Sequence, residues 1–460
     1  TSLGHVQRGG SPSAFDRYIS TVLGYAAVQQ LLPAPEAEPQ LIGLRGHQII
    51  SSPLMECVAK TRSVAELIAN REYETAMEMR GGSFRESFRM IRTMVRAMPH
   101  EPAEGQRQLR LAILHGGGPA PGMNTAVRAA ARVGLDLGHT MLAVQNGFSG
   151  LAKGNLTELD WMSVSGWVSR GGAELGTSRR LPNDDTIRAI AEQITANQID
   201  GLLVIGGWAA YRGAYMLHEA SAEMPALDLP VVCVPASINN DLPGSELSVG
   251  ADTALNSIVE DVDKIKQSAV ASRRTFIVEV MGHDCGYLAL MGGLATGAER
   301  VYLPEEGVTL ADLKVDLDSL REGFEHGKRL GLVIRGEHVD DTYTTAFIKA
   351  LFEREGGDLF DVRGSVLGHV QQGGDPTPFD RIQATRLTSN SVKYLIDQAL
   401  TDSHESAFVG LHHGKVTFTP LSQLPTLIEP DVRRPRKQGW LSLRPLAKVM
   451  ASQAPSASTP

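Results

Sequence analysis

A fifteen-residue segment occurs twice in the chain, at residues 3–17 as LGHVQRGGSPSAFDR and at residues 367–381 as LGHVQQGGDPTPFDR. The two copies lie 364 residues apart and agree at 11 of 15 positions. So dense a match indicates one complete repeat unit preceded by the end of an earlier one. Because the chain starts at Thr1, two residues before the first copy and without an initiator methionine, we expect a fragment of a longer protein.

The repeated segment combines a histidine, a glutamine and a Gly-Gly pair. Glycines let a ligand approach the backbone closely, and histidine and glutamine side chains supply hydrogen-bonding groups. A structural turn would account for the glycines, but not for the recurrence of His5 as His369 and of Gln7 as Gln371. We therefore interpret the segment as a ligand-binding loop.

Composition narrows the class of protein. A hydrophobic content of 42% is typical of a globular chain, and a net charge of −8 argues against a nucleic-acid partner. Cys57, Cys233 and Cys285 have no metal-ligand spacing, which favours reduced thiols and a cytoplasmic location. No apolar run approaches the roughly 18 residues of a membrane span, so no membrane association is expected.

From residue 109 onward, short apolar runs alternate with helical patterns. Helices are predicted from about Thr125 and at 248–267, and strands at 109–114, 202–205, 231–234, 275–280 and 330–334. Continuously apolar strands that alternate with helices predict an α/β fold with a largely parallel sheet.

Ligands of such sheets bind beyond the carboxyl ends of the strands. Four segments directly follow predicted strands and are expected along one edge: 116–124, 206–210, 237–241 and 281–286. The N-terminal part of the chain lacks this regular alternation of strands and helices. It has a predicted helix at 18–32, a turn-rich break at 33–40 and a short strand at 40–44. A connector follows at 53–108, with helical patterns at 63–69 and 73–79. The tail at 451–460 has little apolar content and is predicted to be disordered.

Several motifs in fixed order carry a family resemblance: HGGGPAPGMN (115–124), GGAELGTSR (171–179), PASINND (235–241), RRTFIVEVMGHDCGY (273–287), IRGEH (334–338) and LGHVQQGGDPTPFDR. Together they resemble the ATP-dependent 6-phosphofructokinase family over nearly the whole chain, and most closely its long, tandemly duplicated eukaryotic form. The resemblance implies an α/β phosphofructokinase-type fold of two subdomains with largely parallel, doubly wound sheets. It also implies four regions: the end of a catalytic half at 1–50, a connector at 51–108, a regulatory half at 109–450 and a tail at 451–460.

Two departures from the family pattern concern catalysis. Trp208 stands where catalytic halves have an aspartate that supports Mg²⁺, and an indole cannot hold a hard cation and would crowd the nucleotide. Asn239 stands where the family has the aspartate that deprotonates the sugar hydroxyl. Loss of a general base typically costs about 10²–10⁴-fold in rate. The resemblance therefore implies that this half is catalytically silent.

The resemblance implies instead that this half binds fructose 2,6-bisphosphate as an effector. Positions that match the family's phosphate contacts are Arg179, Arg274, Arg363 and Arg434. Positions that match or flank its sugar contacts are Ser237, Ile238, Asn239, Asn240, Asp241, Met281, Gly282, His283, Glu337, His369, Val370, Gln371 and Gln372. His283 and Gln372 each differ from the family's usual residue. His338 is assigned no role.

Two further sets follow from the resemblance. The remnant of the catalytic half comprises His5, Val6, Gln7 and Arg8, positions that hold fructose 6-phosphate in the family. A candidate nucleotide loop comprises Gly117, Gly118 and Gly122, although Pro119 replaces an aspartate of the catalytic pattern and leaves nucleotide binding open.

For the full-length protein the resemblance implies glycolytic phosphofructokinase activity with ATP and Mg²⁺, and no such cofactor at this chain's own site. The implied partners are the missing catalytic half and further copies of the chain, in a tetramer or larger oligomer. One alternative is a stand-alone, non-catalytic sugar-phosphate-binding protein. Another is an active kinase that uses Asp241 as its base. A pyrophosphate-dependent relative is disfavoured because Trp208 replaces a carboxylate that such enzymes keep.

Overall fold

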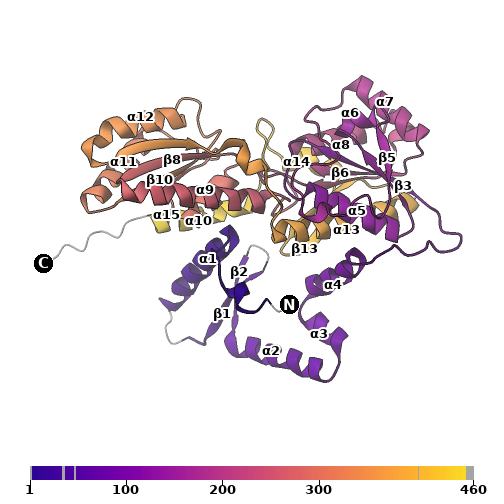
Figure 1. Ribbon diagram of the computed structural model, residues 1–460, viewed down its shortest axis with the longest axis horizontal. Coiled ribbons are helices and arrows are strands. Elements are labelled where there is room, and N and C mark those ends of the chain that lie inside the picture. Colours follow the sequence, from indigo (N-terminus) through magenta and orange to yellow (C-terminus); the bar gives the residue numbers. More distant parts are fainter. Residues whose placement is uncertain (1–2, 34–36, 46–47, 402–403, 452–460) are drawn as a thin grey trace. The chain divides into compact units, whose positions relative to one another are not determined.

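The computed structural model of the chain describes residues 3–33, 37–45, 48–401 and 404–451. These residues form two compact units, each assembled from separate stretches of sequence. The first unit contains residues 1–36, 254–371 and 440–460, and the second contains residues 37–253 and 372–439. Each unit has its own α/β sheet (Figure 1), as the alternation of strands and helices predicted.

The second unit is built on a seven-stranded sheet of order β13-β12-β7-β6-β3-β4-β5. Its inner strands β12, β7, β6, β3 and β4 pair in parallel, while β13 and β5 are antiparallel edge strands. The strands are β3 (Arg110–Gly116), β4 (Thr140–Val144), β5 (Leu156–Leu159), β6 (Gly201–Gly206), β7 (Val231–Pro235), β12 (Ala407–His412) and β13 (Lys415–Pro420).

Helices cover both faces of this sheet (Figure 1). On one face lie α5 (Met123–Asp136) and α13 (Pro378–Leu400), which pack on each other. On the other lie α6 (Gly147–Leu151), α7 (Asp184–Ala196) and α8 (Trp208–Ala220), which enclose an apolar cluster with the strands. Cys233 is fully buried in that cluster, as its apolar surroundings predicted. Shorter elements are η2 (Trp167–Ser169), η3 (Pro225–Leu227), η6 (Leu421–Gln423) and α14 (Leu424–Leu427).

Residues 37–108 contribute a hairpin and three helices to the second unit. The elements are β1 (Gln40–Arg45), β2 (Gln48–Pro53), α2 (Leu54–Ala69), α3 (Tyr73–Met79) and α4 (Gly82–Met94). The strand predicted at 40–44 and the helix at 73–79 are confirmed. The helix predicted around 63–69 begins nine residues earlier, directly after Pro53, whose ring favours the φ of a helix entry.

The first unit is built on a four-stranded parallel sheet of order β11-β8-β10-β9. The strands are β8 (Arg274–Val280), β9 (Arg300–Tyr302), β10 (Leu330–Gly336) and β11 (Asp361–Val366). Its helices are α1 (Ala14–Leu31), α9 (Ala251–Ala271), α10 (Tyr287–Thr296), α11 (Leu310–Glu325), α12 (Thr345–Gly356) and α15 (Arg444–Ala451), with short turns η1 (Gly4–Arg8), η4 (Gly357–Leu359), η5 (Gly368–Gln372) and η7 (Gly439–Leu443). Helices α11 and α12 lie on one face of the sheet, and α9 and α10 on the other (Figure 1).

The two copies of the repeat fold alike. Each forms a short 3₁₀ turn, η1 or η5, followed by a helix, α1 or α13. Both helices begin at a hydroxyl cap, because Ser13 accepts a hydrogen bond from the Asp16 amide and Thr377 accepts one from the Asp380 amide. The internal homology inferred from the sequence is therefore matched by local structure.

The predicted strands are confirmed within two residues, but β2, β4, β5, β9, β11, β12 and β13 were not predicted. Strand β11 shows why: it lies at the edge of its sheet, most of its residues are exposed, and it has no continuous apolar run. Of the tail predicted at 451–460, Ala451 ends helix α15, and residues 452–460 lie outside the described residues. Within the described part of the chain, no helix is both long enough and apolar enough to cross a bilayer.

Candidate functional site

Three of the four predicted loop segments meet at the carboxyl edge of the seven-stranded sheet. Strands β3, β6 and β7 are parallel neighbours, so their following loops emerge at the same edge. The amide of Gly207 donates to the carbonyl of Gly116 over 3.1 Å, and the amide of Ala236 donates to Gly206 over 3.0 Å. The fourth segment, 281–286, follows β8 in the other sheet, so its predicted place on this edge was wrong. Periodicity finds strands but does not say which sheet they join.

The glycine-rich loop after β3 lies beside two polar side chains of the candidate site. A Cβ atom at Gly118 would be 3.2 Å from Arg179 Nη2 and 3.5 Å from Gln372 Nε2. The loop is fastened to the Arg179 segment because the Thr177 hydroxyl donates to the Gly117 carbonyl over 2.8 Å. Gly117 has a φ of 99°, a conformation that favours glycine. This arrangement places exposed N–H donors around an open backbone loop, as anion binding requires.

Gly122 has a different reason to be glycine. Its φ is 105°, and a Cβ atom there would lie 2.5 Å from Val249 Cγ1. Close packing therefore explains this position without a nucleotide, and the proposed nucleotide loop stays a prediction for Gly117 and Gly118.

The loop after β7 holds its one carboxylate inside a hydrogen-bond network. Asp241 is 2% exposed, accepts from the Ser237 hydroxyl over 2.8 Å and accepts from the Asn239 amide over 3.3 Å. Asn240, at a φ of 54°, braces the loop: its side chain donates to the Glu246 carbonyl and accepts from the Ser248 amide. A buried carboxylate with both oxygens engaged is poorly placed to take a proton from a substrate.

Trp208 and Asn239 occupy positions at this edge where a metal-bound nucleotide would need carboxylates. Trp208 is the first residue of α8, and its indole packs against the apolar cluster of the sheet. Of the segments 116–122, 206–210 and 237–241, only the last contains an acidic residue, the buried Asp241. Hard cations require several oxygen donors, so this donor set does not fit Mg²⁺.

The first unit gathers a second set of predicted residues at the carboxyl edge of its own sheet. Glu337, directly after β10, accepts from the His283 amide over 2.6 Å and from the Gly282 amide over 3.3 Å. Gln371 is fully buried and accepts from the Met281 amide over 3.2 Å. His369 and Val370, on the same turn, are exposed. Neighbouring strands thus bring the GHDC, GEH and HVQQ motifs together.

A buried arginine that the sequence did not single out fixes this edge. Arg335, on β10, is 2% exposed and forms an ion pair with Glu279 over 3.1 Å. Its guanidinium also donates to the carbonyls of Gly336, Glu337 and Asp340 over 2.8–3.0 Å. Burial lowers the pKa of Arg335, although the neighbouring carboxylates oppose this effect. Arg335 therefore holds the loop that carries Glu337.

Arg274 and Arg363 do not join that edge. Arg274 is the first residue of β8 and lies 3.6 Å from Asp361, the first residue of β11. Arg363 contacts the same Asp361 over 3.7 Å and Glu353 over 3.6 Å. With a rise of about 3.3 Å per residue, Arg274 stands about 20 Å from the end of β8 that precedes Met281. Arg274 is close to Met281 in sequence, but an extended strand separates the two in space.

The remaining predicted residues lie elsewhere. Arg434 is half-buried in the 428–436 segment of the second unit, where its carbonyl accepts from the Glu429 amide over 3.0 Å. The first repeat copy is exposed along η1, so His5, Val6, Gln7 and Arg8 face solvent in this chain.

Asp380 links the second repeat copy to the start of α9 within the second unit. Its carboxylate is fully buried and accepts from the amides of Gly250 and Thr253 over 2.8 Å each, and from the Thr253 hydroxyl. Burial raises its pKa to about 7, with a further contribution from Asp252, against the lowering effect of these hydrogen bonds. The sequence signalled this aspartate only as part of the repeat.

His338 also has a partner that the sequence did not reveal. Its ring lies 4.3 Å from the ring of His283, centroid to centroid, and its Nδ1 lies 3.1 Å from Asp284 Oδ1. The two histidines are more than 50 residues apart in sequence and meet because β8 and β10 are adjacent. His338 is exposed, as expected for a surface residue, but it has a partner that the sequence did not indicate.

A cavity of about 630 Å³ lies in the first unit, away from these residues. Its lining includes charges of both signs, among them Arg300, Asp316, Arg444 and Lys448. Its lining residues come from α10, β9, α11 and α15, and none belongs to the predicted site.

Comparison with known proteins agrees with this fold. A Phosphofructokinase family model matches residues 110–395. The chain is 43% identical over 449 residues to an ATP-dependent 6-phosphofructokinase of Dictyostelium discoideum, covering 96% of the chain and 54% of that protein. It is 42% identical over 463 residues to the human liver-type enzyme, covering 98% of the chain and 59% of that protein.

Solved structures give the same answer. The phosphofructokinase of Saccharomyces cerevisiae superimposes with a TM-score of 0.94 at 33% identity, covering 99% of the chain and 63% of that chain. A Pichia pastoris phosphofructokinase in the T-state superimposes with a TM-score of 0.92 at 36% identity. The match covers 99% of the present chain and 54% of the Pichia chain. A pyrophosphate-dependent enzyme of Marinobacter aquaeolei, 17% identical with a TM-score of 0.59, shares the fold alone.

The fold and the two loop edges thus define an α/β protein of phosphofructokinase architecture. The chain belongs to the phosphofructokinase family, and specifically to its eukaryotic ATP-dependent 6-phosphofructokinases. It spans a little over half the length of the curated relatives it matches.

Proposed function

We propose that this chain is the regulatory half of a eukaryotic ATP-dependent 6-phosphofructokinase, and that it binds fructose 2,6-bisphosphate without transferring a phosphoryl group. The observation that carries the proposal is the loop after β7. There Asn239 replaces a base, and Asp241 is buried with both oxygens accepting hydrogen bonds. Each unit also retains polar groups suited to a sugar phosphate.

The ligand groups divide by chemistry. Arg179 and Gln372 flank the open loop at Gly118, where N–H donors can receive a phosphate. Glu337 and His369 offer hydrogen-bonding groups to sugar hydroxyls, and Gln371 and Glu337 hold the backbone of 281–283 in place. Arg434 would be a further phosphate contact. The assignment of residues 1–50, 51–108 and 109–450 to catalytic end, connector and regulatory half belongs to the same proposal.

Arg274 and Arg363 require a second copy of the chain. Arg274 lies at the amino end of β8, whose carboxyl end precedes Met281, and about 20 Å of strand is longer than a single fructose bisphosphate. Arg363 lies on the neighbouring strand β11 and contacts the same Asp361 as Arg274. If both sets serve one ligand, the arginines come from a neighbouring subunit. This argument supports the expected homo-oligomer.

In the full-length protein, the other half would transfer a phosphoryl group from ATP to fructose 6-phosphate with the help of Mg²⁺. This is the phosphofructokinase reaction of glycolysis. His5, Gln7 and Arg8 would complete that half's substrate site, which fits their exposure here. Effector binding would bias the enzyme between two states through its different affinity for each.

The binding proposal predicts a loss of affinity on removal of either arginine set. Charge-assisted hydrogen bonds contribute about 1.5–3 kcal/mol, so Arg179→Ala and Arg274→Ala/Arg363→Ala should each weaken fructose 2,6-bisphosphate binding by about 10- to 100-fold or more. Isothermal titration calorimetry measures this effect. Arg188→Ala, which removes an exposed arginine paired with Asp185 on α7, should bind like the parent chain.

A mixing experiment tests the second copy. Neither the Arg274→Ala/Arg363→Ala variant nor a Glu337→Gln variant should bind well alone. Subunits exchanged between them should recover part of the binding capacity, because some interfaces then combine two intact sets. A monomeric parent chain that binds with full affinity would contradict the proposal, and a circular-dichroism melt distinguishes that result from misfolding.

The silent site predicts no turnover of ATP and fructose 6-phosphate in a coupled assay. Because Asp241 is buried and engaged, Asp241→Asn should leave that null result unchanged. Turnover by the parent chain that disappears in a folded Asp241→Asn variant would instead establish an active kinase with a displaced base.

A further inference from the structure

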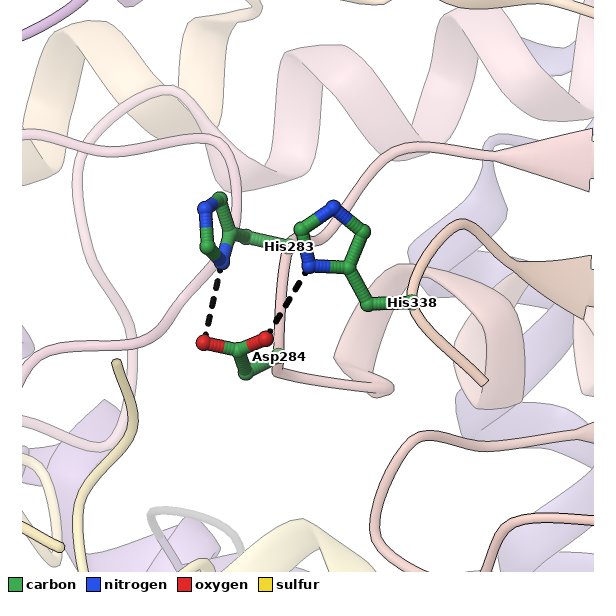
Figure 2. A group of neighbouring side chains, drawn as sticks. All are labelled: His283, Asp284 and His338. Atoms are coloured by element: carbon green, nitrogen blue, oxygen red, sulfur yellow. Dashed lines mark hydrogen bonds and ion pairs between the residues drawn. The ribbon is translucent and has the colours of Figure 1, made fainter. Parts of the chain in front are cut away.

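Two imidazole rings converge on one carboxylate at the carboxyl edge of the four-stranded sheet (Figure 2). His283 and Asp284 follow β8, and His338 follows β10, which pairs with β8 in parallel. Figure 2 shows the Nδ1 atoms of both rings directed at the Asp284 carboxylate, one at each oxygen. All three side chains come from loops fixed by strand ends.

The spacing of the three donors matches a tetrahedral metal site. His283 Nδ1 lies 3.0 Å from Asp284 Oδ2, and His338 Nδ1 lies 3.1 Å from Oδ1. One ligand atom from each residue falls within 4.8 Å of the others. Donor atoms around tetrahedral zinc, with bonds of about 2.0–2.2 Å, lie about 3.3–3.5 Å apart. The two nitrogen–oxygen spacings are therefore close to those around a zinc ion, and side-chain adjustment would bring all three donors around one ion.

One donor atom has the Asp284 carboxylate as its described contact but no hydrogen bond. Nδ1 of His283 is buried, lies 3.0 Å from Asp284 Oδ2 and makes no hydrogen bond within the described residues. Buried polar atoms nearly always have a hydrogen-bond partner. A buried polar atom without one calls for an explanation, such as a bound ion or a functional role. His283 also has a φ of 54°, a strained conformation for a non-glycine residue. Its amide is held there by Glu337.

We propose that His283, Asp284 and His338 bind one divalent transition-metal ion, with zinc as the expected occupant. Two imidazole nitrogens and one carboxylate suit zinc far better than Mg²⁺ or Ca²⁺, which prefer oxygen ligands. Three protein ligands leave a fourth position open to water or an added ligand. Side chains of His283, Asp284 and His338 are 33%, 19% and 48% exposed, so an ion can enter. This site goes beyond the effector proposal and does not depend on it.

The test is a titration of Zn²⁺, and separately of Co²⁺, into the full chain purified without a histidine tag. Cys57→Ser is used as background because Cys57 is the cysteine that is not buried. We expect one ion per chain, and with Co²⁺ the intense visible absorption of tetrahedral coordination. The His283→Gly/His338→Ala variant should bind at least about 100-fold more weakly, and Asp284→Asn at least about 10-fold more weakly. Glycine at 283 also accepts the positive φ.

His413→Gly is the matched control. His413 is likewise exposed, has a φ of 49° and lies 3.7 Å from a carboxylate, Glu246. Its replacement should leave the affinity for zinc unchanged. Parent-level affinity in the double variant, or an affinity no higher than that of an unrelated histidine-containing protein, would overturn the proposal. If the double variant fails to fold, the near-isosteric Asp284→Asn decides alone.

Discussion

Replacement of Arg335 with methionine should lower the free energy of unfolding of the first unit by about 3–5 kcal/mol, the usual effect of breaking one side of a buried ion pair. Methionine keeps much of the side-chain volume, so cavity formation contributes little. What is lost is the ion pair with Glu279 and the hydrogen bonds to the carbonyls of Gly336, Glu337 and Asp340. Glu279 would remain with the Thr345 hydroxyl as its hydrogen-bond partner in the described structure.

Urea unfolding combined with amide hydrogen exchange measures this effect, because exchange reports each unit separately. Faster exchange should be concentrated in the two strands β8 and β10 and in the loop at 337–343. A double variant, Arg335→Met/Glu279→Gln, should be less unstable than Arg335→Met, since it removes the stranded charge as well. Arg188→Met, whose ion pair is exposed, should change stability by less than about 0.5 kcal/mol. An equally small effect at Arg335 would show that the buried pair is not structural.

The sequence predicted most of the buried, continuously apolar strands of the two sheets, although the fully buried β4 was missed. Strands β6 and β7, LLVI and VVCV at their centres, are completely buried and were recognised. Edge strands such as β11 were missed because exposed positions interrupt their apolar pattern. Sheet membership was also beyond sequence reasoning, since the order of strands depends on tertiary packing.

The candidate site shows the same limit at the level of side chains. Motif order and family resemblance identified Glu337, Gln371 and Arg179 as site residues, and each lies beside another predicted residue or loop. Arg335 and His338 were overlooked because their partners, Glu279 and Asp284, are distant in sequence. Arg274 was identified by family resemblance as a phosphate contact, but the sequence did not indicate that a whole strand separates it from Met281. Contacts between strands carry information that a linear pattern lacks.

Replacement of Asp380 should have the second large effect, and its size should depend on pH. Asp380→Ala would leave the amides of Gly250 and Thr253 and the Thr253 hydroxyl without their buried acceptor. Each stranded group costs about 1–3 kcal/mol, so we expect a total loss of about 3–5 kcal/mol. These contacts join the start of α13 to the residues that lead into α9, and hydrogen exchange at 250–253 should accelerate first. Thermal or urea unfolding at pH 7 measures the loss.

Asp380→Asn separates the charge from the shape of this side chain. The pKa of Asp380 is raised from 3.8 to about 7, because burial disfavours the ionised form more than the hydrogen bonds favour it. The folded state therefore binds more protons than the unfolded state between these values. The contribution of Asp380 to the free energy of unfolding is therefore fully present below pH 3.8 and is lost as the pH rises to about 7. The asparagine side chain of the variant has no proton to lose in this pH range. The free energy of unfolding of the parent, measured relative to that of Asp380→Asn, should therefore fall by a few kcal/mol at most between pH 3.8 and about 7.

Above about pH 7 the difference between the two proteins should be constant, because the carboxylate is then ionised in both states. Asp185→Asn on α7 is the control: Asp185 is exposed, and this variant should follow the parent at every pH. A parent–asparagine difference that stays flat from pH 4 to 7 would mean that water or local opening offsets the burial of Asp380. A difference that rises with pH would mean that the three hydrogen bonds outweigh desolvation, and that the carboxylate is ionised at the junction between the repeat and α9 in the native state.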